Sequence, residues 1–131
     1  MIPRRSFFIG FSLFIAIAGV FPANAAEFRP FTTRDFAAAQ ALGKPIVVDV
    51  FATWCPTCKA QEPVIKKIAA LPKFKDLVIF RLDFDTQKAE WRGFKVVRQS
   101  TLIAFKGSRE TARSIAETDQ AALERVLNST L

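Results

Sequence analysis

Residues 46–59 have the sequence IVVDVFATWCPTCK, and the fold predicted for the chain depends mainly on this stretch. Residues 46–51 form an almost continuous apolar run rich in β-branched side chains, which predicts a strand buried on both faces. Apolar residues then recur at helical spacing over residues 58–70. The sequence therefore predicts a buried strand that leads into two cysteines, Cys55 and Cys58, at the start of a helix.

Strand-like and helix-like segments alternate along the rest of the chain. Helices are expected over residues 33–42, 58–70, 86–94 and 119–128, and strands over residues 46–51, 77–82, 101–105 and 110–114. Thr33 and Thr118 are the expected N-caps, Pro63 predicts a helix kink, and residues 106–108 predict a hairpin turn. This order predicts one α/β domain over residues 26–131, with a mixed central sheet covered by helices.

The N-terminus has the pattern of an export signal. Arginines at positions 4–5 precede an apolar run over residues 7–21, which is shorter than the ~20 residues of a membrane-spanning helix. A small-x-small pattern follows at residues 23–25. We predict a secretory signal peptide over residues 1–25 that is cut after Ala25. An uncleaved anchor is the alternative, and the paired arginines also partly resemble a twin-arginine signal.

Composition excludes several classes of function. The 131 residues include two Cys and no His, so a Ser-His-Asp or Cys-His catalytic group cannot form within one chain. The sequence lacks a glycine-rich phosphate loop and any nucleic-acid-binding motif. The net charge of +7 is not concentrated in a run, which favours solvated Lys and Arg side chains over a binding patch.

The two cysteines carry the chemistry that the sequence predicts. Cys55 falls at the expected helix N-terminus, where free N–H groups and the helix dipole stabilise an anion and lower a thiol pKa. Cys58, one turn later, is expected to point back toward Cys55 and to lie deeper. A Cys55 thiolate can then attack a partner disulfide, and Cys58 can resolve the mixed disulfide that forms.

Three other interpretations of the pair remain open. A structural disulfide closing so short a segment would add little stability. A four-thiolate metal site would need two chains, because the chain has no other Cys or His. The pair could also be two buried core thiols. The order of strand, Trp54 and CxxC at a helix start, in a chain with an export signal, favours redox chemistry.

Residues 46–59 resemble the active-site strand and helix start of the thioredoxin family, and the resemblance extends over about residues 33–130. It implies a thioredoxin-like fold and a thiol–disulfide oxidoreductase that needs no cofactor and no metal. It also implies that Asp49 is the buried carboxylate that carries a proton to and from the second cysteine. Trp54 matches the tryptophan beside the reactive surface, and Pro63 matches the proline that kinks the helix.

The position of Asp49 in an apolar strand independently supports its role as a proton carrier. An unpaired carboxylate in the middle of an apolar strand is costly to bury, so burial is expected to raise its pKa into the range useful for proton transfer. The alternative is an outward-facing or structurally hydrogen-bonded side chain. Lys59 and Arg81 are expected either to hold a positive charge near this site or to be simply exposed.

One position departs from the family pattern. Ser100 stands where the family has a cis-proline facing the cysteines. A cis bond before a non-proline residue costs roughly 2.5–4 kcal/mol, so a trans Gln99–Ser100 bond is predicted. The free N–H of Ser100 would add a donor to the partner-binding groove. The groove is expected to be shaped by Trp54, Pro56, Thr57, Gln99, Ser100 and Thr101.

The direction of electron flow is predicted from what the chain lacks. Strongly oxidising periplasmic relatives usually carry a His between the cysteines and an inserted helical subdomain. This chain has Pro56-Thr57 between the cysteines, and its predicted domain is minimal, with no inserted helical subdomain. We therefore expect a periplasmic reductase or interchange enzyme rather than a strong oxidase.

The resemblance also implies the partners. These are proteins with disulfides or thiols, together with a membrane thiol-electron transporter as the electron donor, and the chain is expected to be a monomer that binds no nucleic acid. The alternative function is a non-catalytic binding module with the same fold, which carries metal through bridged Cys55 and Cys58 thiolates or acts as a holdase.

Overall fold

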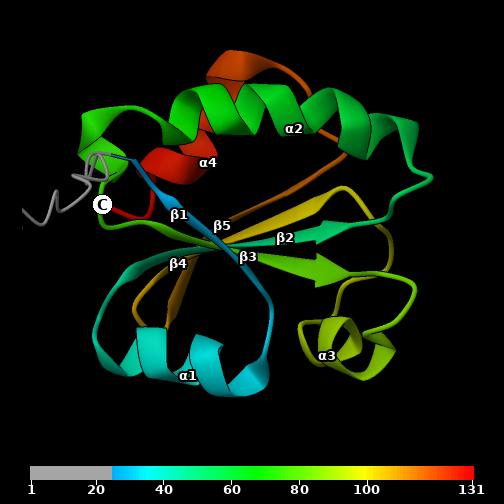
Figure 1. Ribbon diagram of the computed structural model, residues 1–131, viewed down its shortest axis with the longest axis horizontal. Coiled ribbons are helices and arrows are strands. Elements are labelled where there is room, and N and C mark those ends of the chain that lie inside the picture. Colours follow the sequence, from blue (N-terminus) through cyan, green and yellow to red (C-terminus); the bar gives the residue numbers. More distant parts are fainter. Residues whose placement is uncertain (1–24) are drawn as a thin grey trace, which may run out of the picture.

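The computed structural model describes residues 25–131, and Figure 1 shows its arrangement. The predicted signal peptide, residues 1–25, lies outside the described residues except for Ala25. Within the described part of the chain, no helix is both long and apolar enough to cross a membrane.

Five strands, four α-helices and one short 3-10 helix make up the described residues. In chain order they are β1 (Glu27–Pro30), α1 (Thr33–Ala41), β2 (Pro45–Phe51), α2 (Pro56–Ala69), η1 (Pro72–Phe74), β3 (Val78–Asp83), α3 (Lys88–Gly93), β4 (Thr101–Lys106), β5 (Arg109–Ile115) and α4 (Gln120–Asn128).

The strands form one mixed sheet in the order β1-β3-β2-β4-β5. β3 runs parallel to both β1 and β2, whereas β4 is antiparallel to β2 and to β5. Helices α2 and α4 cover one face of the sheet, and α1 and α3 cover the other (Figure 1). This arrangement confirms the predicted α/β fold with a mixed central sheet.

β2 is the central strand of the sheet, and both of its faces are covered. Val48 and Val50 pack with the residues beneath α1, and Val47 packs with residues of α2 and α4. Side chains alternate between the two faces of a strand, so Asp49 faces the same side as Val47, toward α2. The strand ends at Phe51, and the chain reaches the first turn of α2 within five residues.

The structure corrects the element ends and adds two elements. β1 was not predicted, because its sequence EFRP lacks the β-branched residues that mark strands, and η1 was missed as well. The N-cap of α1 is Thr32 rather than Thr33, since the Thr32 hydroxyl accepts the Asp35 N–H at 3.0 Å. The N-cap of α4 is Asp119 rather than Thr118. Each cap is displaced by one residue, a shift that spacing alone does not resolve.

Candidate active site

The two cysteines lie where β2 gives way to α2. Cys55 is the N-cap of α2, and its sulfur accepts the backbone N–H of Cys58 at 3.1 Å. Pro56 occupies the first helical turn, where its missing N–H costs no helical hydrogen bond. Both cysteines are free thiols. The helix start thus directs an N–H group at the Cys55 sulfur, as the sequence predicted.

Both thiols are buried in the free protein. Cys55 is 1% exposed and Cys58 is 8% exposed. The cover over Cys55 comes partly from Ser100, whose hydroxyl oxygen is 3.1 Å from its sulfur.

The thiol pKa values move in opposite directions. Burial alone raises the pKa of Cys55, but hydrogen bonds from the Cys58 side chain, the Ser100 hydroxyl and the Cys58 N–H together bring it below its ordinary value. Burial and the bond to Cys55 raise the pKa of Cys58 above its ordinary value, although the Ser100 hydroxyl acts against this shift. Cys55 is therefore the thiol that ionises first, as a nucleophile requires.

Ser100 lies opposite the cysteines, and its contacts differ from the prediction. The described residues contain no cis peptide bond, so the trans Gln99–Ser100 bond is confirmed. The Ser100 N–H donates to the Val50 carbonyl at 2.8 Å and is not free for a partner protein. Ser100 is fully buried and Thr101 is 1% exposed, because Thr101 begins β4 and the preceding Ser100 N–H is already bonded to β2. In the free protein these two side chains are therefore covered and are not part of an exposed groove.

A buried carboxylate, Asp49, is paired with the partly exposed Arg81 close to the cysteines. They occupy facing positions on β2 and β3, and the Arg81 Nε lies 3.5 Å from the Asp49 carboxylate. Burial raises the pKa of Asp49 to about 6, although Arg81 acts to lower it and Glu62 to raise it further. Asp49 is thus inward-facing, and its proton affinity suits transfer near neutral pH.

Glu62 and Gln61 belong to the site and were missed in the sequence. Glu62 lies 3.8 Å from the Arg81 guanidinium, and it follows Cys58 by four residues, so helical spacing could have placed both on one side of α2. Gln61 is 1% exposed and donates to the Glu117 carbonyl at 2.7 Å. No sequence pattern marks Gln61, because its partners come from distant loops.

A pocket of about 210 Å³ opens beside Cys58. Its lining residues are Phe51, Ala52, Thr53, Cys58, Lys59, Glu62 and Arg81. Lys59 is exposed at its rim, and Arg81 connects it to Asp49. The structure thus places Lys59 and Arg81 close to the second cysteine.

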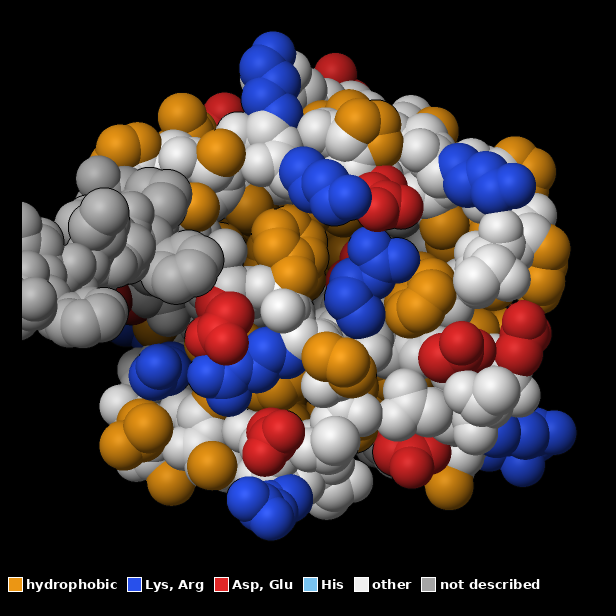
Figure 2. All heavy atoms as spheres, in the orientation of Figure 1, with side chains coloured by type: hydrophobic (Ala, Val, Ile, Leu, Met, Phe, Trp, Pro, Cys, Tyr) orange, Lys and Arg blue, Asp and Glu red, His pale blue; other side chains and the backbone are white. Residues whose placement is uncertain are grey.

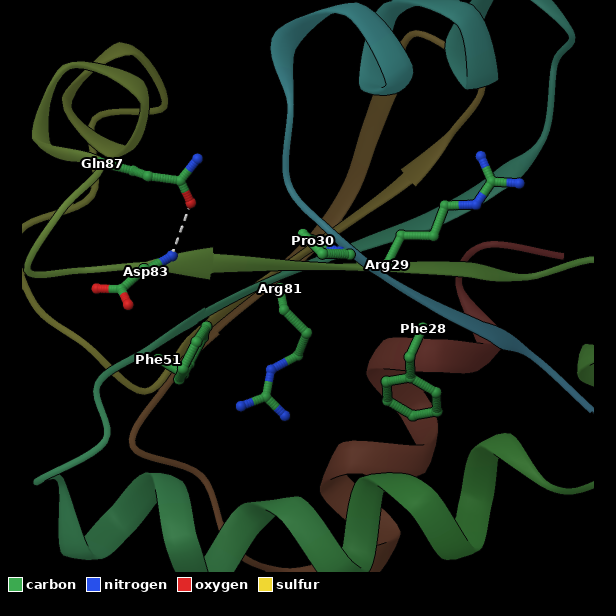
Figure 3. Close-up of a pocket in the computed structure, with 7 residues that line it drawn as sticks. All are labelled: Phe28, Arg29, Pro30, Phe51, Arg81, Asp83 and Gln87. Atoms are coloured by element: carbon green, nitrogen blue, oxygen red, sulfur yellow. Dashed lines mark hydrogen bonds between the residues drawn. The ribbon is translucent and has the colours of Figure 1, made fainter.

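A second, larger pocket of about 350 Å³ adjoins the first through Phe51 and Arg81. Figure 3 shows Phe28, Arg81 and Phe51 projecting from β1, β3 and β2 toward α2. The Arg81 guanidinium lies over the Phe51 ring, 4.1 Å from its centroid. On this face of the molecule, Lys and Arg side chains are spread among Asp and Glu side chains (Figure 2).

Trp54 forms the exposed rim on the other side of Cys55. It is 55% exposed, and its indole N–H donates to Asp85 at 2.9 Å. Pro56 is exposed, and Thr57 and Gln99 are partly buried. These four residues remain available to a partner. Within residues 25–131 no group of three or more His, Cys, Asp or Glu side chains could hold a metal ion.

Comparison with known proteins identifies the family. Residues 27–129 match the thioredoxin family model. A thioredoxin of Mycolicibacterium smegmatis is 38% identical over 103 residues, which cover 76% of this chain and 91% of that protein. A thioredoxin of Mycobacterium bovis is 41% identical over 85 residues, covering 65% of this chain and 72% of that protein.

A solved structure gives the same result. The crystal structure of Trxlp from Edwardsiella tarda superposes with a TM-score of 0.75 at 44% sequence identity, covering 77% of this chain and 98% of that one. The chain therefore belongs to the thioredoxin family, and it is a thiol–disulfide oxidoreductase.

Proposed function

We propose that this protein is an exported, periplasmic enzyme that reduces or exchanges disulfides of other proteins through Cys55 and Cys58. The observation that carries the proposal is the Cys55 sulfur at the N-cap of α2, which accepts the Cys58 N–H. This contact stabilises a thiolate at Cys55 and leaves Cys58 as the protonated thiol next to it.

The reaction follows from these two positions. The Cys55 thiolate attacks one sulfur of a partner disulfide, so that a Cys55–partner bond forms and the partner's own disulfide breaks. Cys58 then loses its proton and attacks the Cys55 sulfur. The Cys55–Cys58 disulfide forms, the partner leaves as a thiolate that takes up a proton, and two electrons have passed to the partner.

Asp49 is the proposed acceptor of the Cys58 proton. Its pKa of about 6 allows it to be ionised at neutral pH and still to bind a proton transiently. The pocket beside Cys58 supports the proposal, since its lining includes both Cys58 and Arg81, the partner of Asp49. Protons can exchange with solvent through this pocket.

The proposed partner surface is the exposed rim around Cys55. Trp54 offers a large, half-exposed ring that Asp85 holds in place, and Pro56, Thr57 and Gln99 lie next to it. A partner that docks here brings its disulfide to Cys55. We propose that the protein acts as a monomer and receives its electrons from a membrane thiol transporter.

Insulin reduction tests the activity. The domain over residues 26–131 is expected to reduce insulin disulfides with dithiothreitol as electron donor, and Cys55→Ser is expected to abolish this turnover. Cys58→Ser should accumulate mixed disulfides with exported proteins, whereas the matched Cys55→Ser variant should accumulate none. Absence of turnover in the unmodified domain would instead favour a binding module.

The reduction potential of the cysteine pair tests the proposed direction of electron flow. Equilibration of the Cys55–Cys58 pair in glutathione buffers is expected to give a value near that of thioredoxin, about −270 mV. A value near about −120 mV, typical of strong oxidants, would make the protein a disulfide donor.

Cell fractionation tests the export. The full chain expressed in a Gram-negative host is expected in the periplasmic fraction, with an N-terminus at residue 26. Retention of the full-length protein in the cytoplasm would contradict both the export and the membrane electron donor.

A further inference from the structure

Ser100 has a backbone conformation that is unusual for its residue type. Its φ of 62° lies in the left-handed region, where a side chain with a Cβ is strained and glycine is normally favoured. Such strain persists only where the surroundings fix the conformation, and it is concentrated at functional sites. The contacts of Ser100 show what fixes it and where its side chain is directed.

Three hydrogen bonds hold the Ser100 backbone. Its N–H donates to the Val50 carbonyl at 2.8 Å, and its carbonyl accepts the Ala116 N–H at 2.9 Å. The same carbonyl lies 3.4 Å from the side-chain amide nitrogen of Gln61, a buried residue of α2. Because these contacts come from β2, from α2 and from the residue after β5, the position of Ser100 relative to β2 and α2 is fixed.

The side chain held in this way contacts both cysteines. The Ser100 hydroxyl oxygen is 3.1 Å from the Cys55 sulfur and 3.1 Å from the Cys58 sulfur. All three residues are buried, so water does not compete for these contacts. A hydroxyl has one proton to donate and two lone pairs that accept, and it can therefore donate to only one of the two sulfurs at a time.

We propose that Ser100 is a third catalytic group of this site, whose hydroxyl donates its hydrogen bond to whichever cysteine sulfur carries the negative charge. In the reduced enzyme the Ser100 O–H donates to the Cys55 thiolate. After Cys55 has formed the mixed disulfide and Cys58 has lost its proton, the O–H turns to the Cys58 thiolate. This inference rests on the proposed roles of Cys55 and Cys58.

The hydroxyl neither gains nor loses a proton over the cycle. Its O–H bond rotates between the two sulfurs, while the Cys58 proton leaves to Asp49 and the departing partner thiolate takes its proton from solvent. One S–S bond forms between Cys55 and Cys58 as the Cys55–partner bond breaks. Ser100 therefore stabilises the attacking thiolate in both steps without becoming charged itself.

Two substitutions test the role of the hydroxyl separately from the backbone. Ser100→Ala removes the hydroxyl and keeps the strained Cβ, whereas Ser100→Gly removes the hydroxyl and suits the left-handed backbone. Ser114→Ala is the matched control, since the Ser114 hydroxyl on β5 has no hydrogen-bond partner within residues 25–131 and lies outside the site. Circular dichroism establishes that each variant is folded.

The first measurement is the thiolate absorbance at 240 nm as a function of pH. A hydrogen bond to a charged group is worth enough to move a titration midpoint by about one to two pH units. We expect the Cys55 midpoint to rise by this amount in both Ser100 variants and to be unchanged in Ser114→Ala. The reduction potential should become more negative by about 30 mV for each tenfold loss of thiolate stabilisation.

The second measurement is the lifetime of the mixed disulfide in a single turnover. With Cys58 intact, both Ser100 variants should accumulate the mixed disulfide that the unmodified enzyme resolves without accumulation. Unchanged titration, potential and lifetime in both variants would overturn the role of Ser100. A change in Ser100→Ala alone would also overturn it, because it would trace the effect to backbone strain.

These results are separable from the proposed function. If the unmodified domain reduces insulin but the Ser100 variants behave as it does, only the role of Ser100 fails. If the unmodified domain has no turnover, the proposed function itself fails.

Discussion

The two faces of the sheet differ in the side chains that they bury. The face covered by α1 and α3 is apolar and aromatic, and Phe36 packs there against Phe31, Phe80, Phe94 and Phe105 with ring centroids 5.2–5.9 Å apart. The face covered by α2 contains buried Asp49 and Gln61, close to the two cysteines.

The difference shows how stability and chemistry are divided in a small domain. Aromatic pairs in edge-to-face arrangements stabilise the first face and leave no polar group unpaired. On the second face, a carboxyl with a raised pKa and a strained serine both oppose stability. The apolar face offsets these costs, so substitutions on the two faces should have opposite effects.

The largest expected effect is on the aromatic face. Phe36→Ala should lower the free energy of unfolding by about 3–5 kcal/mol, because it leaves a cavity among four other aromatic rings. Urea unfolding measures this loss, and Phe36→Leu, which keeps a large apolar side chain, should lose less stability than Phe36→Ala. The Cys55 titration should not move, and a shift there would show that the two faces are coupled.

Asp49→Asn should raise the free energy of unfolding at neutral pH, whereas Phe36→Ala lowers it. The pKa of Asp49 is about 6 in the folded protein and about 3.9 in an unfolded chain. The folded state binds this proton more tightly, so stability falls as pH rises from about 4 to about 6. At pH 7 the free energy of unfolding of the variant should exceed that of the unmodified protein by up to about 3 kcal/mol, and at pH 4 the two should not differ.

Urea unfolding at several pH values tests this prediction, and insulin reduction by the same variant should slow. Asp76→Asn, which removes an exposed carboxyl in the turn before β3, is the control that should leave the dependence of stability on pH unchanged. If the free energy of unfolding depended on pH in the same way for Asp49→Asn and the unmodified protein, Asp49 would not be the buried titrating group.

Glu62→Gln is expected to have the smallest effect. The negative charge of Glu62 raises the pKa of Asp49, and Glu62 also lies near Arg81. Its removal should lower the Asp49 pKa only slightly, since a partly exposed charge is screened by solvent. The upper end of the pH range over which stability declines should shift downward with that pKa. Glu124→Gln on α4 is the matched control, and a shift of equal size there would indicate a general charge effect.

The sequence was sufficient for the features that depend on local pattern. The apolar run at residues 46–51 identified the central strand, and helical spacing after Cys55 identified the helix that the cysteines begin. The raised pKa of Asp49 was also predictable, because a carboxyl in a strand buried on both faces is desolvated in any arrangement of the other elements.

Some neighbours of the site could not be predicted in this way. Gln61 reaches the Ser100 and Glu117 carbonyls, which are 39 and 56 residues away in the chain. The short strand β1 forms only because β3 offers its edge, since the sequence EFRP has little strand preference of its own. Both features depend on segments that meet only after the chain has folded.

The sequence by itself determined the class of chemistry, because two cysteines at a helix start after a buried strand constrain their own ionisation through local N–H groups. Only the tertiary structure decided what faces those thiols. It turned Ser100 inward, occupied its N–H with Val50 and brought its hydroxyl to both sulfurs. The physical reason is that β4 must pair with β2, and this pairing fixes the preceding loop against the start of α2.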